Sequence, residues 1–255
     1  MGVIDGSVTI GILALQGAFA EHEAIIKKLR LKCQPSTDPP ASSPNAAAVI
    51  PLLVKTPTDL ASCDALIIPG GESTTIALLA KLNGLLEPLR TFSQHKPIWG
   101  TCAGAILLSS GGVVGAKRGG QEVIGGVDVK VERNGWGPQL ESFEADLDVE
   151  VLEQPKRPFK GVFIRAPVIL ALTPTHQTPP RPPIQVVARL SDHHSLDEES
   201  STDDDARRIV AVRQGHHLLT AFHPELTKDS RFHEYFVREC VIPSVQGDIL
   251  DPMNR

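Results

Sequence analysis

The feature that most constrains the fold is a unit that occurs three times: a short apolar run, a turn containing glycine, and a helical pattern. The apolar runs span residues 8–15, 65–71 and 97–100. Such runs are typical of strands buried on both faces, and a helix after each indicates that the strands are parallel. The pattern therefore predicts an α/β fold with a mostly parallel central sheet flanked by helices. Sites in such folds lie at the carboxyl ends of the strands.

The first two helical patterns span residues 18–29 and 73–82, and Ser73 is available to cap the second. Beyond Gly111 the segment 111–137 is rich in glycine and alternates in polarity, which indicates an added antiparallel strand region. The C-terminal third adds predicted strands and a closing helix, at 184–190, 207–215, 216–225 and 231–240 respectively.

The 255 residues are expected to form a single domain, 1–255, with two insertions. Residues 33–48 and 173–206 both begin with proline-rich stretches, which cannot continue a helix. The second also contains an acidic tract, which has too little apolar surface to fold alone. We expect both segments to be flexible surface insertions, although the pattern of 184–190 within the second predicts a strand.

Composition excludes several function classes. The net charge is -5, and seven acidic residues lie in 191–206, so the rest of the chain carries only +2. This small excess gives no basic surface of the kind that binds nucleic acid. No apolar run approaches the ~18 residues that span a bilayer. The four cysteines are scattered, and the histidine pairs at 193–194 and 216–217 lack partners at metal-ligand spacing. A cytoplasmic protein without metal or cofactor is expected.

Cys102 lies between Gly100 and Gly104, where the third apolar run meets its helix. Two interpretations stand at this point: a nucleophile on a sharp turn, or a small buried residue, since free cysteine is among the most buried residue types. Glycines permit a tight turn and close packing of helix on strand, and a helix N-terminus favours a thiolate. A nucleophile also needs a general base.

The candidate base is His223, with Glu225 two residues later. If the segment is extended, as Pro224 favours, both side chains leave one face and the carboxylate can orient the imidazole. The alternative is that His223 merely closes a strand and Glu225 caps the next segment of the chain. For the oxyanion, the backbone N–H groups of Ala103 and Gly71 are the candidate donors.

Together, GTCAG, AFHPE and PGGEST resemble class I glutamine amidotransferases. The motifs LALQGAFAEHE, GGESTT, VERNGWGPQLESFE, FIRAP and FHPELT resemble the glutaminase subunit of pyridoxal 5'-phosphate synthase. They run from Leu13 to Thr227 and cover nearly all of the chain outside the two insertions.

The resemblance implies that Cys102 attacks the carboxamide of L-glutamine, that His223 moves the protons, and that Glu225 orients the histidine. It implies a partner, a (β/α)8-barrel synthase subunit that consumes the ammonia, with Gln16 at their interface. The residues implied to bind glutamine are Gly71, Glu72, Ser73, Arg133, Ile164 and Arg165.

This sequence departs from the family at Pro138, which stands where the family commonly has arginine and removes a charge and a backbone donor. Two other functions remain as alternatives. One is a different Cys-His hydrolase on a similar sheet, against which Arg133, Arg165 and the GGEST turn argue. The other is a non-catalytic binding subunit.

Overall fold

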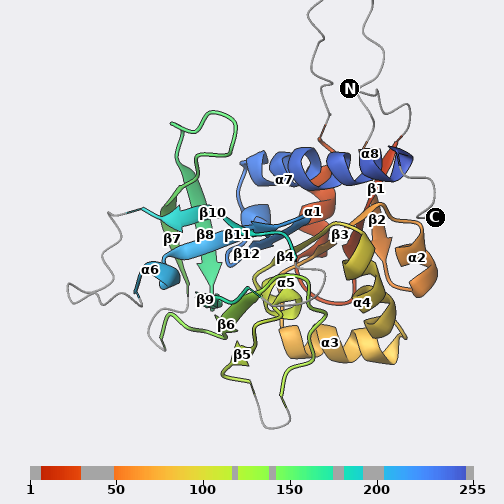
Figure 1. The fold of residues 1–255 in the computed structure, drawn as a ribbon, viewed down its shortest axis with the longest axis horizontal. Helices are drawn as coiled ribbons and strands as arrows, with labels where there is room; N and C mark the ends of the chain where they lie inside the picture. The colour runs from red at the N-terminus through yellow and green to blue at the C-terminus, as the bar shows by residue number, and fades with distance from the viewer. Residues whose placement is uncertain are drawn as a thin grey trace, which may run out of the picture.

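The computed structural model describes residues 7–29, 49–116, 120–137, 142–174, 181–191 and 204–250. The predicted insertion 33–48, Pro138, the first histidine pair and most of the acidic tract lie outside the described residues. Within them the α/β fold predicted from the sequence is confirmed, with helices on both faces of a large sheet (Figure 1).

Among the described residues, nine strands form one sheet in the order β2-β1-β3-β4-β12-β11-β10-β7-β8. Neighbours are parallel from β2 to β12 and antiparallel from β12 to β8, so the mostly parallel prediction holds for one half only. Two residues, Gly215 and His216, separate β11 from β12, and so short a connection joins only antiparallel neighbours. The strands are β1 (Val8–Leu13), β2 (Val49–Val54), β3 (Ala65–Ile68), β4 (Ile98–Thr101), β7 (Ser142–Asp148), β8 (Phe159–Ile164), β10 (Ile184–Leu190), β11 (Ile209–Gln214) and β12 (His217–Thr220).

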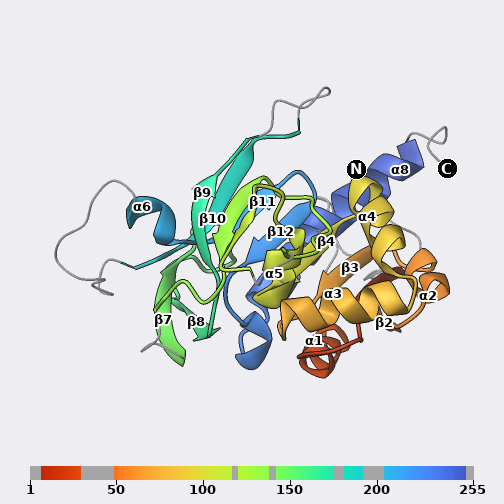
Figure 2. The same ribbon diagram turned by 90° about the horizontal axis from the view of Figure 1, so that it is seen from below.

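The two ends of this sheet lie far apart, with β2 at one end and β7 and β8 at the other (Figure 2). No motif predicts β2. Its Pro51 lacks a backbone N–H, which is tolerated because β2 is an edge strand.

A second sheet consists of β5 (Val113–Val114), β6 (Val129–Glu132) and β9 (Val168–Leu172). The expectation of antiparallel strands within 111–137 is wrong for β5 and β6, which are parallel. The antiparallel neighbour of β6 is β9, which lies outside that segment. The fourteen residues between β5 and β6 are long enough to return the chain to the same end of the sheet, as a parallel pair requires.

Helices cover both faces of the large sheet because its parallel strands are apolar on both sides. On one face, Ile10 and Ile12 pack in a cluster with Phe232 and Phe236 of α7. On the other, Leu66 and Ile68 pack with residues of α3, α4 and α5. The helices are α1 (Phe19–Ile26), α2 (Pro57–Ala61), α3 (Ser73–Leu82), α4 (Leu86–His95), α5 (Ala103–Leu108), α6 (Asp204–Arg207), α7 (Arg231–Phe236) and α8 (Ile242–Leu250), with a π-helical turn at Val237–Val241 joining the last two.

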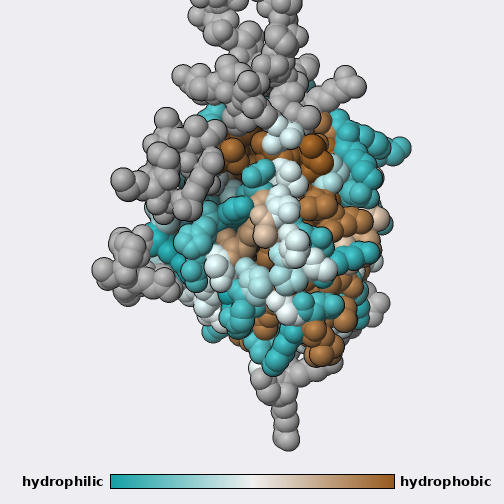
Figure 3. Space-filling model, turned by 90° about the vertical axis from the view of Figure 1, so that its right-hand side faces the viewer, coloured by the Kyte–Doolittle hydropathy of each residue, from teal (hydrophilic) through white to brown (hydrophobic). Residues whose placement is uncertain are grey.

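The outer faces of the helices are mixed in polarity. Leu78 and Leu82, one turn apart on α3, are exposed. Figure 3 shows apolar patches interrupted by polar residues on the side that carries α2 and α4, as expected of helices that bury one face. None of the helices in the described ranges combines the length and apolar character needed to cross a bilayer.

Two buried histidines couple the stability of this fold to pH. Burial, with a smaller contribution from the charge of His216, lowers the pKa of His217 to about 3, and burial lowers the pKa of His233 to about 3. In the unfolded chain both bind a proton near a pKa of about 6.5. Between these values the unfolded chain binds more protons, so the free energy of unfolding falls as the pH drops below about 6.5.

We predict that His217→Gln reduces this dependence. Urea unfolding between about pH 6.5 and about pH 5 should show a slope smaller by up to about 1.4 kcal/mol per pH unit than in the parent chain. The same change at exposed His95 is the control and should leave the slope unaltered. Equal slopes in the His217→Gln variant and the parent would contradict a buried neutral His217.

Candidate active site

Cys102 lies on the turn between β4 and α5, in a strained backbone conformation with φ 47° and ψ -101°. It is 5% exposed, and its N–H donates to the carbonyl of Thr220 in β12, 2.9 Å away. A Cβ on Gly100 would lie 2.4 Å from the carbonyl oxygen of Gly104, and one on Gly104 would lie 2.1 Å from that of Ile68. Only glycine fits at these two positions, and their packing holds the cysteine turn against β3 and β4.

His223 and Glu225 follow β12 and lie beside the cysteine turn. His223 Nδ1 and Glu225 Oε1 are 2.7 Å apart, and both residues are buried. The extended segment expected from Pro224 is wrong, because Pro224–Leu226 forms a 3-10 turn. This tight turn brings the carboxylate of Glu225 back to the imidazole of His223. The expected contact is therefore present, but the turn forms it, not an extended strand with both side chains on one face.

The partners of His223 decide its charge. Burial lowers the pKa of this imidazole, but hydrogen bonds to Cys102 and Glu225, together with their charges, outweigh burial and raise the pKa to about 10. The ring therefore carries a proton at neutral pH. A protonated imidazole stabilises a neighbouring thiolate, which is the nucleophilic form of cysteine.

The glycine turn after β3 packs directly against these residues. A Cβ on Gly70 would lie 2.3 Å from Cε1 of His223 and 3.3 Å from Cβ of Cys102. A Cβ on Gly71 would lie 2.4 Å from Oε1 of Gln16. The turn after β3 and the cysteine turn thus meet at one edge of the sheet.

Gln16 holds the glycine turn from the other side. Its Oε1 accepts the N–H of Glu72 at 2.8 Å, and the carbonyl of Gly70 accepts the N–H of Ala18 at 3.0 Å. The loop after β1 is therefore fastened to the turn after β3 by polar contacts.

Glu72 is the N-cap of α3, which corrects the expectation that Ser73 is the cap. The carboxylate accepts the N–H of Thr75 at 2.8 Å and the hydroxyls of Thr74 and Thr75. Partial burial raises the pKa of this carboxyl, but these hydrogen bonds prevail and lower it to about 2. Ser73 lies one residue too far along to cap the helix, and its side chain is buried.

A polar network joins this helix start to the segment after β6. Arg133 pairs with Glu72 at 2.7 Å and donates to Oε1 of Gln121 at 3.0 Å. The Ser73 hydroxyl donates to the same Gln121 oxygen at 3.1 Å. Gln121 carries no sequence signal, because it is a single polar residue in a glycine-rich stretch, yet it connects two of the predicted substrate-binding residues.

Ile164 and Arg165 lie at and just beyond the end of β8. The carbonyl oxygen of Ile164 is 3.9 Å from Cys102 Sγ. Arg165 has a φ of 41°, and its exposed side chain has no ion pair with the described residues. Unlike Arg133, which pairs with Glu72, Arg165 is thus not tied through its side chain to the other predicted site residues that the structure describes.

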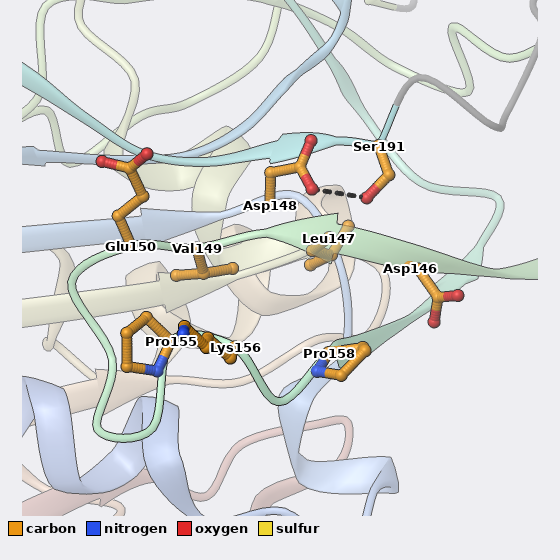
Figure 4. Close-up of a pocket in the computed structure, with 9 residues that line it drawn as sticks. All are labelled: Asp146, Leu147, Asp148, Val149, Glu150, Pro155, Lys156, Pro158 and Ser191. Atoms are coloured by element: carbon orange, nitrogen blue, oxygen red, sulfur yellow. Dashed lines mark hydrogen bonds between the residues drawn. The ribbon is translucent and has the colours of Figure 1, made fainter.

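A shallow pocket lies elsewhere on the molecule, between β7, β10 and the segment that leads to β8 (Figure 4). Its lining includes three acidic residues, Asp146, Asp148 and Glu150, and the hydroxyl of Ser191 donates to Asp148 at 2.8 Å. None of the predicted site residues lines this pocket. In the described ranges, no three His, Cys, Asp or Glu side chains gather as a metal site would require.

Comparison with known proteins identifies the family. A family model described as the SNO glutamine amidotransferase family matches residues 12–242. The chain belongs to this family. The resemblance predicted from the sequence motifs is thereby confirmed.

Curated relatives match across most of the chain. A probable pyridoxal 5'-phosphate synthase subunit PDX2 of Arabidopsis thaliana is 41% identical over 91% of this chain and 85% of its own length. The pyridoxal 5'-phosphate synthase subunit PdxT of Listeria welshimeri is 40% identical over 91% of this chain and 98% of its own length.

Solved structures agree on the fold. A crystal structure of a glutamine amidotransferase is 37% identical and superposes with a TM-score of 0.67, covering 91% of this chain and 98% of that one. A putative GMP synthase subunit of Thermoplasma acidophilum, 11% identical, has a TM-score of 0.54 over 96% of this chain and 98% of that chain, and shows likeness of fold alone.

We predict that Gly70→Ala displaces His223 and lowers the kcat of glutamine hydrolysis about 10- to 100-fold, because the new methyl group overlaps a buried ring. Gly247→Ala, at an exposed position of α8 with open space around it, is the control. It should retain the parent kcat and gain about 0.5–1 kcal/mol of stability. A steady-state assay with thermal melting checks both, and a parent-like kcat in Gly70→Ala would contradict the close packing described.

Proposed function

We propose that the chain hydrolyses L-glutamine with a Cys102–His223–Glu225 triad and delivers the ammonia to a synthase subunit that makes pyridoxal 5'-phosphate. The observation that carries the proposal is the buried 2.7 Å contact between His223 and Glu225, beside a cysteine on a strained strand-to-helix turn. Membership of a glutamine amidotransferase family supports an amide substrate.

In the proposed mechanism the Cys102 sulfur attacks the carboxamide carbon of glutamine. The C–O double bond opens to an oxyanion, for which the N–H groups of Gly71 and Ala103 are the donors. His223 gives its proton to the nitrogen as the C–N bond breaks, so ammonia leaves and a thioester remains. Water then attacks the thioester, His223 takes a proton from that water, and glutamate departs as the C–S bond breaks.

Glu225 acts through His223. Its hydrogen bond to Nδ1 fixes the ring orientation and leaves Nε2 for the cysteine and the leaving nitrogen. The raised pKa of His223 suits an acid that must protonate a poor leaving group early in the reaction.

Glutamine presents an α-carboxylate and an α-ammonium, which need charged and polar partners. Arg133 and Arg165 supply positive charge, and Glu72, held ionised by its low pKa, supplies negative charge. Ser73, Gly71 and Ile164 complete the proposed binding residues, and the pairing of Arg133 with Glu72 supports a site organised before substrate arrives.

The partner is inferred from the relatives, which are named as synthase subunits. We propose a (β/α)8-barrel synthase subunit that docks near Gln16, and a cytoplasmic location for both. Gln16 lies against Gly71, so a partner that moves Gln16 would alter the proposed oxyanion donor. Little activity is expected without the partner.

We predict that Cys102→Ala abolishes glutamate release. The rate is measured for the parent and the variant, each with and without the synthase subunit. The parent should be slow alone and faster with its partner. Parent-like turnover in Cys102→Ala would remove the cysteine from the mechanism, and no turnover in the parent with bound partner would favour a non-catalytic binding subunit.

We predict that Arg133→Gln raises the KM for glutamine about 10- to 100-fold, since a hydrogen bond to a charged group contributes about 1.5–3 kcal/mol. The kcat should change much less. Arg157→Gln, which removes a half-exposed surface pair with Asp229, is the control and should leave KM unaltered. An unchanged KM in Arg133→Gln would argue for a different Cys-His hydrolase.

A further inference from the structure

A second histidine lies behind Glu225. His22, on α1, is fully buried, and its Nε2 is 3.4 Å from Glu225 Oε2 and 3.4 Å from the hydroxyl oxygen of Thr101. Its Nδ1 is 2.9 Å from Nε2 of His233 on α7. A single ring thus faces the residue before the nucleophile, the carboxylate of the triad and a further buried histidine.

The carboxylate oxygen that faces His22 is short of donors. Glu225 Oε1 is taken by His223, whereas Oε2 is buried and has no hydrogen bond of ordinary geometry with the described residues. An unsatisfied buried carboxylate oxygen is costly, so a nearby N–H has a large effect. The Nε2 of His22 lies 3.4 Å from Oε2, so a small movement of either side chain would let it donate this N–H.

The contact between the two histidines fixes where their protons lie. One hydrogen lies between His22 Nδ1 and His233 Nε2. If His22 donated it, the proton of His233 would lie on Nδ1, which is buried without a partner, and the bare Nε2 of His22 would face a carboxylate. If His233 donates it, the Nε2 of His22 carries a proton that points at Glu225. The second arrangement avoids both an orphaned N–H and a repulsion between lone pairs.

The surroundings keep both rings neutral. Burial, with electrostatic coupling to His233 and His223, lowers the pKa of His22 well below its ordinary value, and burial lowers the pKa of His233 to about 3. Among the described residues, His22 contacts the titratable groups of His233 and Glu225, and the charge of His223 also acts on it. Trp99 packs edge-on against both rings, with centroids 5.7 Å from His22 and 4.8 Å from His233, and completes the apolar wall.

We propose that His22 is a positioning residue of the triad, a neutral Nε2–H donor that holds Glu225 Oε2 so that Oε1 faces His223, with His233 fixing its tautomer. This inference rests on the proposed function in that Glu225 orients the base. It extends the series of polar contacts from Cys102 to His233, across three regions of the chain that are far apart in sequence: α1, the cysteine turn and residues 223–233.

Two substitutions at position 22 distinguish the role of the Nε2 of His22 from that of its Nδ1. Gln at position 22 can place an amide N–H₂ near Nε2, whereas Asn can reach only the position of Nδ1. We expect His22→Asn to lower kcat for glutamine hydrolysis about 10- to 100-fold with KM within about twofold, because the base is misoriented while the substrate contacts remain. His22→Gln should restore most of the lost activity.

Nuclear magnetic resonance of the histidine rings gives a readout that turnover does not influence. The ¹⁵N shifts of the full-length chain should show His22 and His233 as neutral Nε2–H tautomers. The titration midpoint of His223, identified by its absence in His223→Asn, should fall by about half a pH unit or more in His22→Asn, toward the value in Glu225→Gln, because a loosened carboxylate stabilises the imidazolium less.

If His22→Asn does not fold, as judged by thermal melting, His233→Leu tests the same chain of donors without touching His22 or Glu225. It should shift the His223 midpoint in the same direction by a smaller amount. A purely structural role for His22 would lower the melting temperature and leave the midpoint unmoved.

The proposal is overturned by an Nδ1–H or charged His22 in the parent, by an unshifted His223 midpoint in the folded variants, or by equal losses in His22→Asn and His22→Gln. The proposed function fails separately, through a parent chain that releases no glutamate with its partner bound. In that event the tautomers and the His223 midpoint still decide the role of His22.

Discussion

The site depends on how closely the backbone can approach at the carboxyl edge of β3 and β4. A side chain on Gly100 or Gly104 would overlap a neighbouring carbonyl oxygen, so α5 begins in direct contact with both strands. That contact maintains the positive φ of Cys102, which α5 follows immediately. A residue larger than glycine would lift the helix and carry the thiol away from its base.

The same neighbourhood holds three histidines in two charge states, with His223 protonated and His22 and His233 neutral. His223 faces a carboxylate and a thiol, and keeps its proton in spite of burial. His233 faces aromatic rings and a neutral histidine, and burial alone lowers its pKa. His22 lies between them, close to one oxygen of Glu225. A protein can give neighbouring groups different roles at one pH, such as acid and hydrogen-bond donor, because their environments shift their pKa values apart.

The antiparallel half of the sheet also contributes to the site. β8 is the far edge strand in the sheet order, yet the carbonyl of Val162 accepts the N–H of His223 at 2.8 Å, and Ile164 lies beside the cysteine. The curl of this half brings β8 back toward the end of β12. The sheet thus positions the nucleophile with its parallel strands and supports the base with its antiparallel ones.

The sequence by itself determined the local elements and the chemical types at the site. Apolar runs predicted β1, β3 and β4, the helical pattern predicted α3 at 73–82, and a cysteine between glycines with a distant His-Pro-Glu indicated a nucleophile and a base. These features are readable because side-chain period and glycine sterics act over a few residues.

Only the tertiary structure decided the rest. The sheet is half antiparallel, Glu72 rather than Ser73 caps α3, and a 3-10 turn rather than a strand joins His223 to Glu225. Gln121 and His22 acquire their partners from residues up to 211 positions away in the chain. A contact over such a separation leaves no period or spacing in the sequence, because it exists only once the core has brought the elements together.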